Sequence, residues 1–150
     1  MSYNEKFMKR AISLAKRAYS HDEVPIGAVV VSGDEIIATA YNKREKSNDA
    51  TAHAEILAIK KACKKIGDFR LLGCDIYVTL EPCVMCMGAI LNSRISNLYF
   101  GAYIANGSIS ASEISSRAEL NHKTNVSGGY LESECSSLIS NYFKDKRTKK

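Results

Sequence analysis

Residues 79–86 have the sequence Thr-Leu-Glu-Pro-Cys-Val-Met-Cys, which predicts a strand end, a turn and a helix start that carries two metal ligands. The apolar run from Asp75 to Leu80 predicts a short strand. Pro82 predicts that a helix begins at or beside it, because the first helical turn does not need the amide hydrogen that proline lacks. Cys83 and Cys86 are three positions apart, so they project from one face of that helix and can bind one ion.

A third ligand and a free acid come from His53-Ala54-Glu55, about thirty positions earlier. These residues open an apolar-periodic segment that predicts a helix ending at Gly67. Two residues separated by one position differ by about 200° around a helix, so both can face one ion only at a helix end. We therefore expect the His53 and Cys83 helices to direct their N-termini at one place. Unpaired amides and positive helix dipoles there should lower the pKa of both thiols.

The number of ligands separates two kinds of zinc site. Four protein ligands close a structural site, whereas a catalytic site has three and leaves one position for water. His53, Cys83 and Cys86 are the candidate ligands of one Zn2+ per chain, with a bound water or hydroxide. Glu55, which does not bind the metal, is the candidate catalytic residue. It would take a proton from the water and deliver it to a ring nitrogen as an exocyclic amine leaves as ammonia.

A structural zinc site is the competing interpretation, because two cysteines three apart with a distant histidine are also typical of such sites. It needs a fourth protein ligand. The three other cysteines are more typical of buried thiols. The two other histidines lie in polar turns, where an exposed side chain is the ordinary expectation. The candidates for a fourth ligand are Cys63, Cys74, Cys135, His21 and His122.

The rest of the chain predicts alternating helices and strands. A helix is expected over 4–20 and a hairpin over 26–41, with its turn at Ser32-Gly33-Asp34. Strands are expected at 95–100 and around Val126, and a last helix over 131–146. The order of strands and helices implies parallel pairing in the second half of the sheet.

Composition indicates an ordinary enzyme domain that could bind a polyanion. The 150 residues are 45% hydrophobic with a net charge of +5, and no apolar run approaches a membrane span. Together with the lack of a signal-peptide h-region, this leads us to expect a cytoplasmic location. In a reducing compartment the odd number of five cysteines indicates metal ligands and buried thiols, not disulfides. Two basic groups suit either a nucleic acid or a solvated surface. They comprise Lys60, Lys61, Lys64 and Lys65, and Lys144, Lys146, Arg147, Lys149 and Lys150.

The patterns H-x-E and P-C-x-x-C form the known signature of zinc nucleobase deaminases. With further segments they make the chain resemble the bacterial tRNA wobble adenosine deaminases, within the cytidine/deoxycytidylate deaminase superfamily. The segments that carry the resemblance are 23–29, Asn42, 51–56, 79–90, Asn121-His122 and Glu134-Cys135.

This resemblance implies a cytidine-deaminase-like three-layer α/β/α fold with a five-stranded mixed sheet, formed by one zinc-dependent deaminase domain over residues 1–150. It implies a homodimer that converts adenosine to inosine by hydrolysis at the wobble position of tRNA, with the anticodon loop as partner. By the same resemblance His53, Cys83 and Cys86 hold zinc, Glu55 shuttles the proton, and Asn42 hydrogen-bonds the flipped-out adenosine.

The chain departs from that family after Phe100-Gly101-Ala102, where a basic residue, an aspartate and a lysine commonly follow. Here the chain has Tyr103–Ser108, and Ile104 cannot accept a hydrogen bond from a ribose 2′-hydroxyl. A free-base or nucleoside deaminase acting on guanine, cytosine or cytidine is therefore one alternative. A non-catalytic zinc-binding scaffold is the other. A basic C-terminal helix with a stacking group such as Tyr142 or Phe143 would favour RNA.

Overall fold

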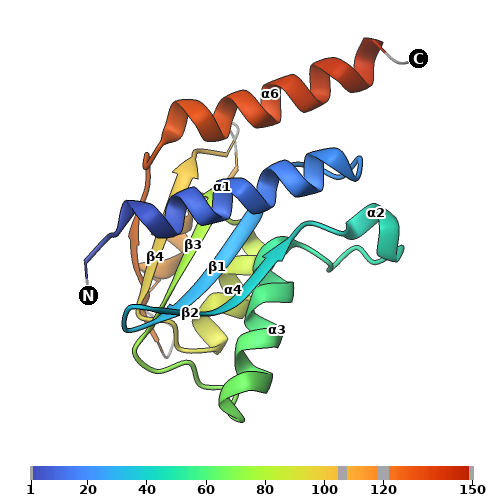
Figure 1. Ribbon diagram of the computed structural model, residues 1–150. Coiled ribbons are helices and arrows are strands. Elements are labelled where there is room, and N and C mark those ends of the chain that lie inside the picture. Colours follow the sequence, from blue (N-terminus) through green and yellow to red (C-terminus); the bar gives the residue numbers. More distant parts are fainter. Residues whose placement is uncertain (1, 105–107, 118–121, 149–150) are drawn as a thin grey trace.

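A computed structural model describes residues 2–104, 108–117 and 122–148. Asn121, residues 105–107 of the departing segment, and the terminal Lys149 and Lys150 lie outside the described residues. The rest forms a five-stranded sheet with helices on its two faces (Figure 1). In chain order the elements are α1 (Glu5–Ser20), β1 (Gly27–Ser32), β2 (Glu35–Tyr41), α2 (Arg44–Ser47), α3 (Ala54–Ile66), β3 (Cys74–Leu80), α4 (Val84–Asn92), β4 (Asn97–Ala102), α5 (Ala111–Ser115), β5 (Asn125–Ser127) and α6 (Glu132–Thr148).

The sheet is mixed, as the resemblance implies, and its strands follow the order β2-β1-β3-β4-β5. β1 pairs antiparallel with both β2 and β3, whereas β3, β4 and β5 run parallel. Gly27 pairs with Tyr41, and Ala28 pairs with Val78. The start of β1 therefore lies beside the carboxyl ends of β2 and β3, and these two ends share one edge of the sheet.

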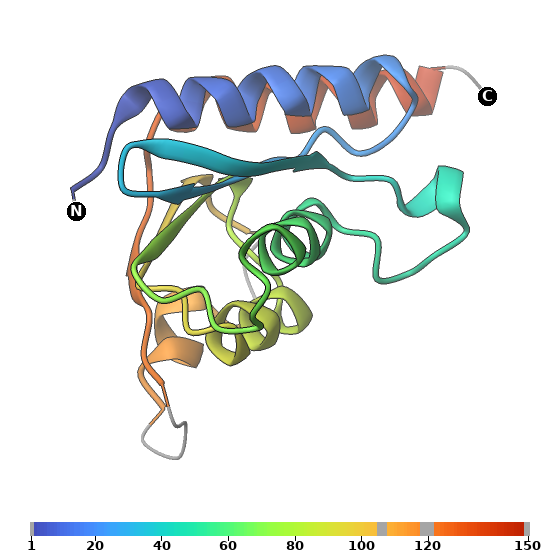
Figure 2. The same cartoon turned by 60° about the horizontal axis from the view of Figure 1, so that its bottom comes forward.

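Two hydrophobic cores, one on each face of the sheet, hold the three layers together. α1 and α6 lie side by side on one face, and α3, α4 and α5 cover the other (Figure 2). Phe7 and Met8 of α1 pack with Tyr77 of β3 in the first core. Ala58 of α3 and Ile90 of α4 pack in the second. The three-layer α/β/α prediction is confirmed.

The predicted helices and strands are present, with small differences at their ends. α3 ends at Gly67, whose φ of +80° is the left-handed conformation expected of a terminating glycine. The short helices α2 and α5 were not predicted, because five residues or fewer are too short for a periodic pattern. Among the described residues, no helix is long and apolar enough to cross a membrane.

Pro82 lies near the start of α4, as predicted, but outside its first turn. α4 begins at Val84, and Cys83 is its N-cap in an extended conformation, with φ −73° and ψ 174°. Pro82 therefore lies one residue before the cap, where its ring restricts the preceding residue to an extended backbone. Because α4 begins two residues after Pro82, Cys83 occupies the N-cap position.

We expect Gly27→Ala to lower the free energy of unfolding by about 1–3 kcal/mol, because extra atoms in a packed interior strain their surroundings. A Cβ at Gly27 would overlap the Ala11 carbonyl oxygen and approach the Ala15 amide nitrogen, both backbone atoms of α1. Urea denaturation measures the change. Gly88→Ala in α4 is the matched control, since a Cβ there meets open space and should stabilise the helix by up to about 1 kcal/mol. Equal stabilities for the two variants would contradict this account of the α1–β1 contact.

Candidate active site

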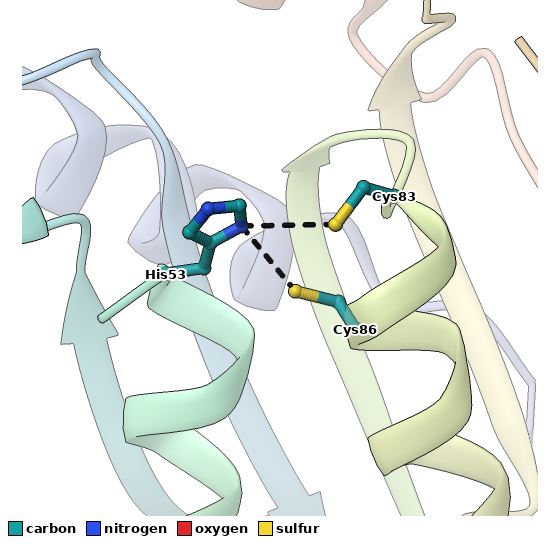
Figure 3. Close-up of side chains that lie close together, drawn as sticks. All are labelled: His53, Cys83 and Cys86. Carbon is teal, nitrogen blue, oxygen red and sulfur yellow. Dashed lines mark hydrogen bonds between the residues drawn. The ribbon is translucent and has the colours of Figure 1, made fainter. Parts of the chain in front are cut away.

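Two helix N-termini meet where β2 and β3 end. His53 is the N-cap of α3 and Cys83 is the N-cap of α4, and both have extended backbones that turn their side chains off the helix ends. Cys86 lies one turn further along α4, on the side that faces His53 (Figure 3). The expectation that both helices direct their N-termini at one place is confirmed.

The three side chains have the spacing of a metal site. His53 Nδ1 lies 3.5 Å from Cys86 Sγ and 3.8 Å from Cys83 Sγ. All three ligand atoms lie within 4.8 Å of one another. A tetrahedral zinc ion with ordinary bond lengths holds a nitrogen and a sulfur about 3.6 Å apart. The chain therefore presents these ligands at nearly the separation that zinc requires.

No fourth protein ligand joins this group among residues 2–104, 108–117 and 122–148. Cys74 and Cys135 are buried elsewhere, as predicted, and Cys63 is only partly buried. His21 is exposed, as predicted, whereas His122 is half-buried and its Nε2 lies 2.8 Å from the Ile95 carbonyl oxygen. Three ligands within the described chain favour a catalytic arrangement over a closed structural one.

Glu55 is buried beside this group and does not belong to it. Its side chain is 3% exposed, and Oε1 has no hydrogen-bond partner within the described chain. Burial raises the pKa of this carboxyl group to about 7. A buried polar atom without a partner costs about 1–3 kcal/mol, more when it is charged. Oε1 is therefore suited to a group from outside the chain, such as a water held at the neighbouring metal position.

The two thiols ionise differently in the metal-free chain, contrary to the expectation that both pKa values fall. Hydrogen bonds from the Cys86 thiol and from His53 lower the pKa of Cys83 to about 3. The pKa of Cys86 is raised, because its thiol donates to Cys83 and is itself buried. The hydrogen bond to Cys83 also raises the pKa of His53. Mutual hydrogen bonding thus outweighs the helix dipole at Cys86.

Asn42 lies at the carboxyl end of β2 and is 4% exposed. Its backbone N–H donates to the Ile26 carbonyl at 3.1 Å, and the next residue, Lys43, donates to the Ala52 carbonyl at 3.0 Å. These bonds bring the Asn42 segment beside the residue that precedes His53. The fold thus brings the predicted substrate-binding residue to the predicted metal ligands.

An apolar cavity of about 320 Å3 adjoins Cys83, and sequence reasoning did not identify its walls. It is lined by Cys83, Val84, Ile104, Ser108 and Ile109. Val84 and Ile109 are 65% and 55% exposed, so this cavity presents apolar side chains to solvent.

Glu81, at the carboxyl end of β3, is buried. Sequence analysis did not predict that Glu81 is buried, although an acidic residue directly after an apolar strand was a signal that could have indicated it.

Known proteins are similar to this chain in sequence and in fold. The family model for the cytidine and deoxycytidylate deaminase zinc-binding region matches residues 1–102. The tRNA-specific adenosine deaminase of Bacillus subtilis (strain 168) is 46% identical over 152 aligned residues, covering 100% of this chain and 94% of that protein. Two solved structures are also similar. One comes from a study of A-to-I editing by tRNA:A34 deaminases at the wobble position of transfer RNA. It is 43% identical in sequence, with a TM-score of 0.85, and the match covers 90% of this chain and 99% of that one. The other is guanine deaminase from Bacillus subtilis, with 43% identity, a TM-score of 0.65, and coverage of 68% and 66%.

In chelator-treated protein we expect Cys83 to react with iodoacetamide nearly as fast at pH 5 as at pH 7, because its pKa of about 3 leaves it ionised throughout. Mass spectrometry of the alkylated peptides measures each rate. Cys63 is the internal control. Burial raises its pKa, so its reaction should accelerate about tenfold per pH unit over the same range. Zinc added beforehand should protect Cys83. The same steep acceleration at Cys83 would contradict the assigned ionisation.

Proposed function

The chain belongs to the family of the cytidine and deoxycytidylate deaminase zinc-binding region, and from this premise we propose that it hydrolyses adenosine to inosine in tRNA, at the wobble position. The similar tRNA-specific adenosine deaminases support the substrate. The observation that carries the chemistry is the His53, Cys83 and Cys86 group beside the unpaired carboxylate oxygen of Glu55.

We propose that these three ligands hold one zinc ion per chain. When bound, zinc lets a water molecule act as a nucleophile near neutral pH. Glu55 accepts a proton from the attacking water and gives it to N1 of adenine as the water oxygen bonds to C6. Glu55 then moves the hydroxyl proton to the exocyclic amine, which leaves as ammonia, and C6 becomes the carbonyl of inosine. The buried position of Glu55 and its oxygen without a partner in the described chain suit a group that exchanges protons with a water at the metal position.

The substrate base must leave its stack to reach this buried site. We propose that Asn42 hydrogen-bonds the flipped-out adenosine, because its amide offers both a donor and an acceptor. The cavity beside Cys83 would receive the apolar faces of the base.

Cations gather at the same end of the sheet, which supports a polyanionic substrate. Arg17 lies 5.4 Å and Lys43 lies 5.0 Å from the ring centre of Tyr41, and Lys61 joins them around a cavity of about 170 Å3. Within the described residues, no carboxylate is ion-paired with Arg17, Lys43 or Lys61. Of these three cations, Lys43 follows Asn42 directly, whereas Arg17 belongs to α1 and Lys61 to α3.

The C-terminal helix reaches this end as well. Lys146 of α6 forms a 3.0 Å ion pair with Asp22, in the turn before β1. Tyr142 was predicted as one possible stacking group, but it is 5% exposed and its hydroxyl donates to the Asp22 carbonyl. That prediction is wrong for Tyr142. Phe143 is 44% exposed, so it keeps the proposed role.

A free-base deaminase is the second candidate function. It is favoured by the similarity to a guanine deaminase over about two-thirds of the chain and by Ile104 in the departing segment. The three-ligand group argues against a non-catalytic scaffold. A homodimer, which the resemblance implies, and a cytoplasmic location remain part of the proposal.

We expect the purified zinc-loaded protein to form inosine in tRNA that carries adenosine at the wobble position. Free guanine, cytosine and cytidine, offered in parallel, should release no ammonia. Raising salt from 50 to 200 mM should lower kcat/KM for tRNA at least about tenfold, because phosphate contacts release counterions. Turnover of a free base without turnover of tRNA would replace this proposal with the second candidate.

Glu55→Gln should retain zinc and lower kcat by at least about 10²- to 10⁴-fold, because glutamine cannot shuttle a proton. Metal content by mass spectrometry and inosine formation measure the two effects. Glu35→Gln, the same change at an exposed residue of β2, serves as the matched control with normal activity expected. Wild-type turnover by Glu55→Gln would remove Glu55 from the mechanism.

A further inference from the structure

Glu81 connects the metal-binding turn to the segment that follows β4. Its side chain is 5% exposed. Oε1 accepts a hydrogen bond from the Ile104 backbone N–H at 3.1 Å, and Oε2 accepts one from the Ala111 backbone N–H at 2.8 Å. Its own backbone N–H donates to the Ala102 carbonyl at 2.8 Å. Glu81, two positions before Cys83, thus bonds the backbone after β4 at three residues, Ala102, Ile104 and Ala111.

Described residues close to the two amides bound by Glu81 form a wall of the cavity beside Cys83. Ile104 and Ile109 line that wall, between or at the points where Glu81 bonds the backbone. α5 begins at Ala111 and has only five residues, too few to be stable by itself. The Glu81 carboxylate therefore ties the backbone at Ile104 and at the start of α5 to the residue two positions before Cys83, alongside the burial of Ala111 in the core.

A neutral turn could satisfy two backbone amides without burying a charge, and burial of a carboxylate is costly unless it is well paired. A carboxylate differs from an amide in offering acceptors only, at two oxygens fixed relative to each other. Here one carboxylate oxygen accepts a hydrogen bond from Ile104 and the other accepts one from Ala111. This arrangement is suited to holding these two backbone positions at a fixed distance from β3.

We propose that Glu81 is a positioning residue that sets the gap between the candidate metal centre and the apolar wall of Ile104 and Ile109, and so determines how tightly the nucleobase packs. This inference rests on the proposed function. The wall touches the base before and during reaction alike, so its displacement should weaken binding more than it slows chemistry.

Glu81→Gln tests the inference, because its amide keeps one acceptor and turns an NH2 group toward a backbone N–H. We expect KM for tRNA to rise about tenfold, the discrimination that one apolar contact provides, with kcat changed less than about threefold. Zinc content and the pH profile should be unchanged. Glu81→Asp, which keeps both acceptors on a shorter stem, should fall between wild type and Glu81→Gln. Glu113→Gln, an exposed acid in the same segment, is the control and should match wild type.

A second variant and a substrate-free measurement keep the inference separable from folding and from the proposed function. Ile109→Ala shortens the wall at a half-exposed side chain and should raise KM without affecting the Glu81 bonds. Amide hydrogen exchange, measured without RNA, should be faster at Ile104 and Ala111 in Glu81→Gln only. Unchanged exchange in Glu81→Gln, or an unchanged KM in Ile109→Ala, would overturn the inference. Absence of tRNA turnover by the wild-type protein would instead overturn the proposed function.

Discussion

The convergence of two helix N-termini on one point is the constraint on which the rest of the structure depends. His53 and Cys83 follow β2 and β3, which are separated in the sheet by β1 alone. Two strands in that relation lie roughly 9–10 Å apart, a distance that side chains from both sides can span. Because β1 is antiparallel to both neighbours, their carboxyl ends share one edge. The hairpin formed by β1 and β2 is therefore needed to bring the ligands together.

Most of the fold could be predicted because its long elements carry strong periodicity and clear end signals. The spacing of His53, Glu55, Cys83 and Cys86 predicted their meeting place, since only helix ends allow it. The family and the α/β/α layers followed from the residues around these motifs and agree with the known relatives. Motif residues are predictable because each must satisfy a stereochemical rule that is visible in the sequence.

Features that depend on contacts between distant segments could not be predicted. The role of Glu81 requires knowing that residues 104 and 111 return to β3. Tyr142 is an ordinary aromatic residue of an amphipathic helix until its hydroxyl meets Asp22. The opposite pKa shifts of Cys83 and Cys86 in the metal-free chain depend on the hydrogen bond between the two thiols, which requires knowing where both side chains lie. Spacing alone treats the two thiols as equivalent.

The unpaired oxygen of Glu55 has a consequence for how this sequence can change. It is a point of local frustration: the folded chain without a ligand is less stable with glutamate at position 55 than it would be with a neutral or apolar residue there. Selection for stability alone would remove such a carboxylate, so its persistence needs a functional pressure that opposes that drift. Among the described residues, the core under α1 and α6 has no buried side-chain oxygen or nitrogen that lacks a hydrogen-bond partner. That face can accept stabilising substitutions, which leaves the frustrated site a margin of stability in which to persist.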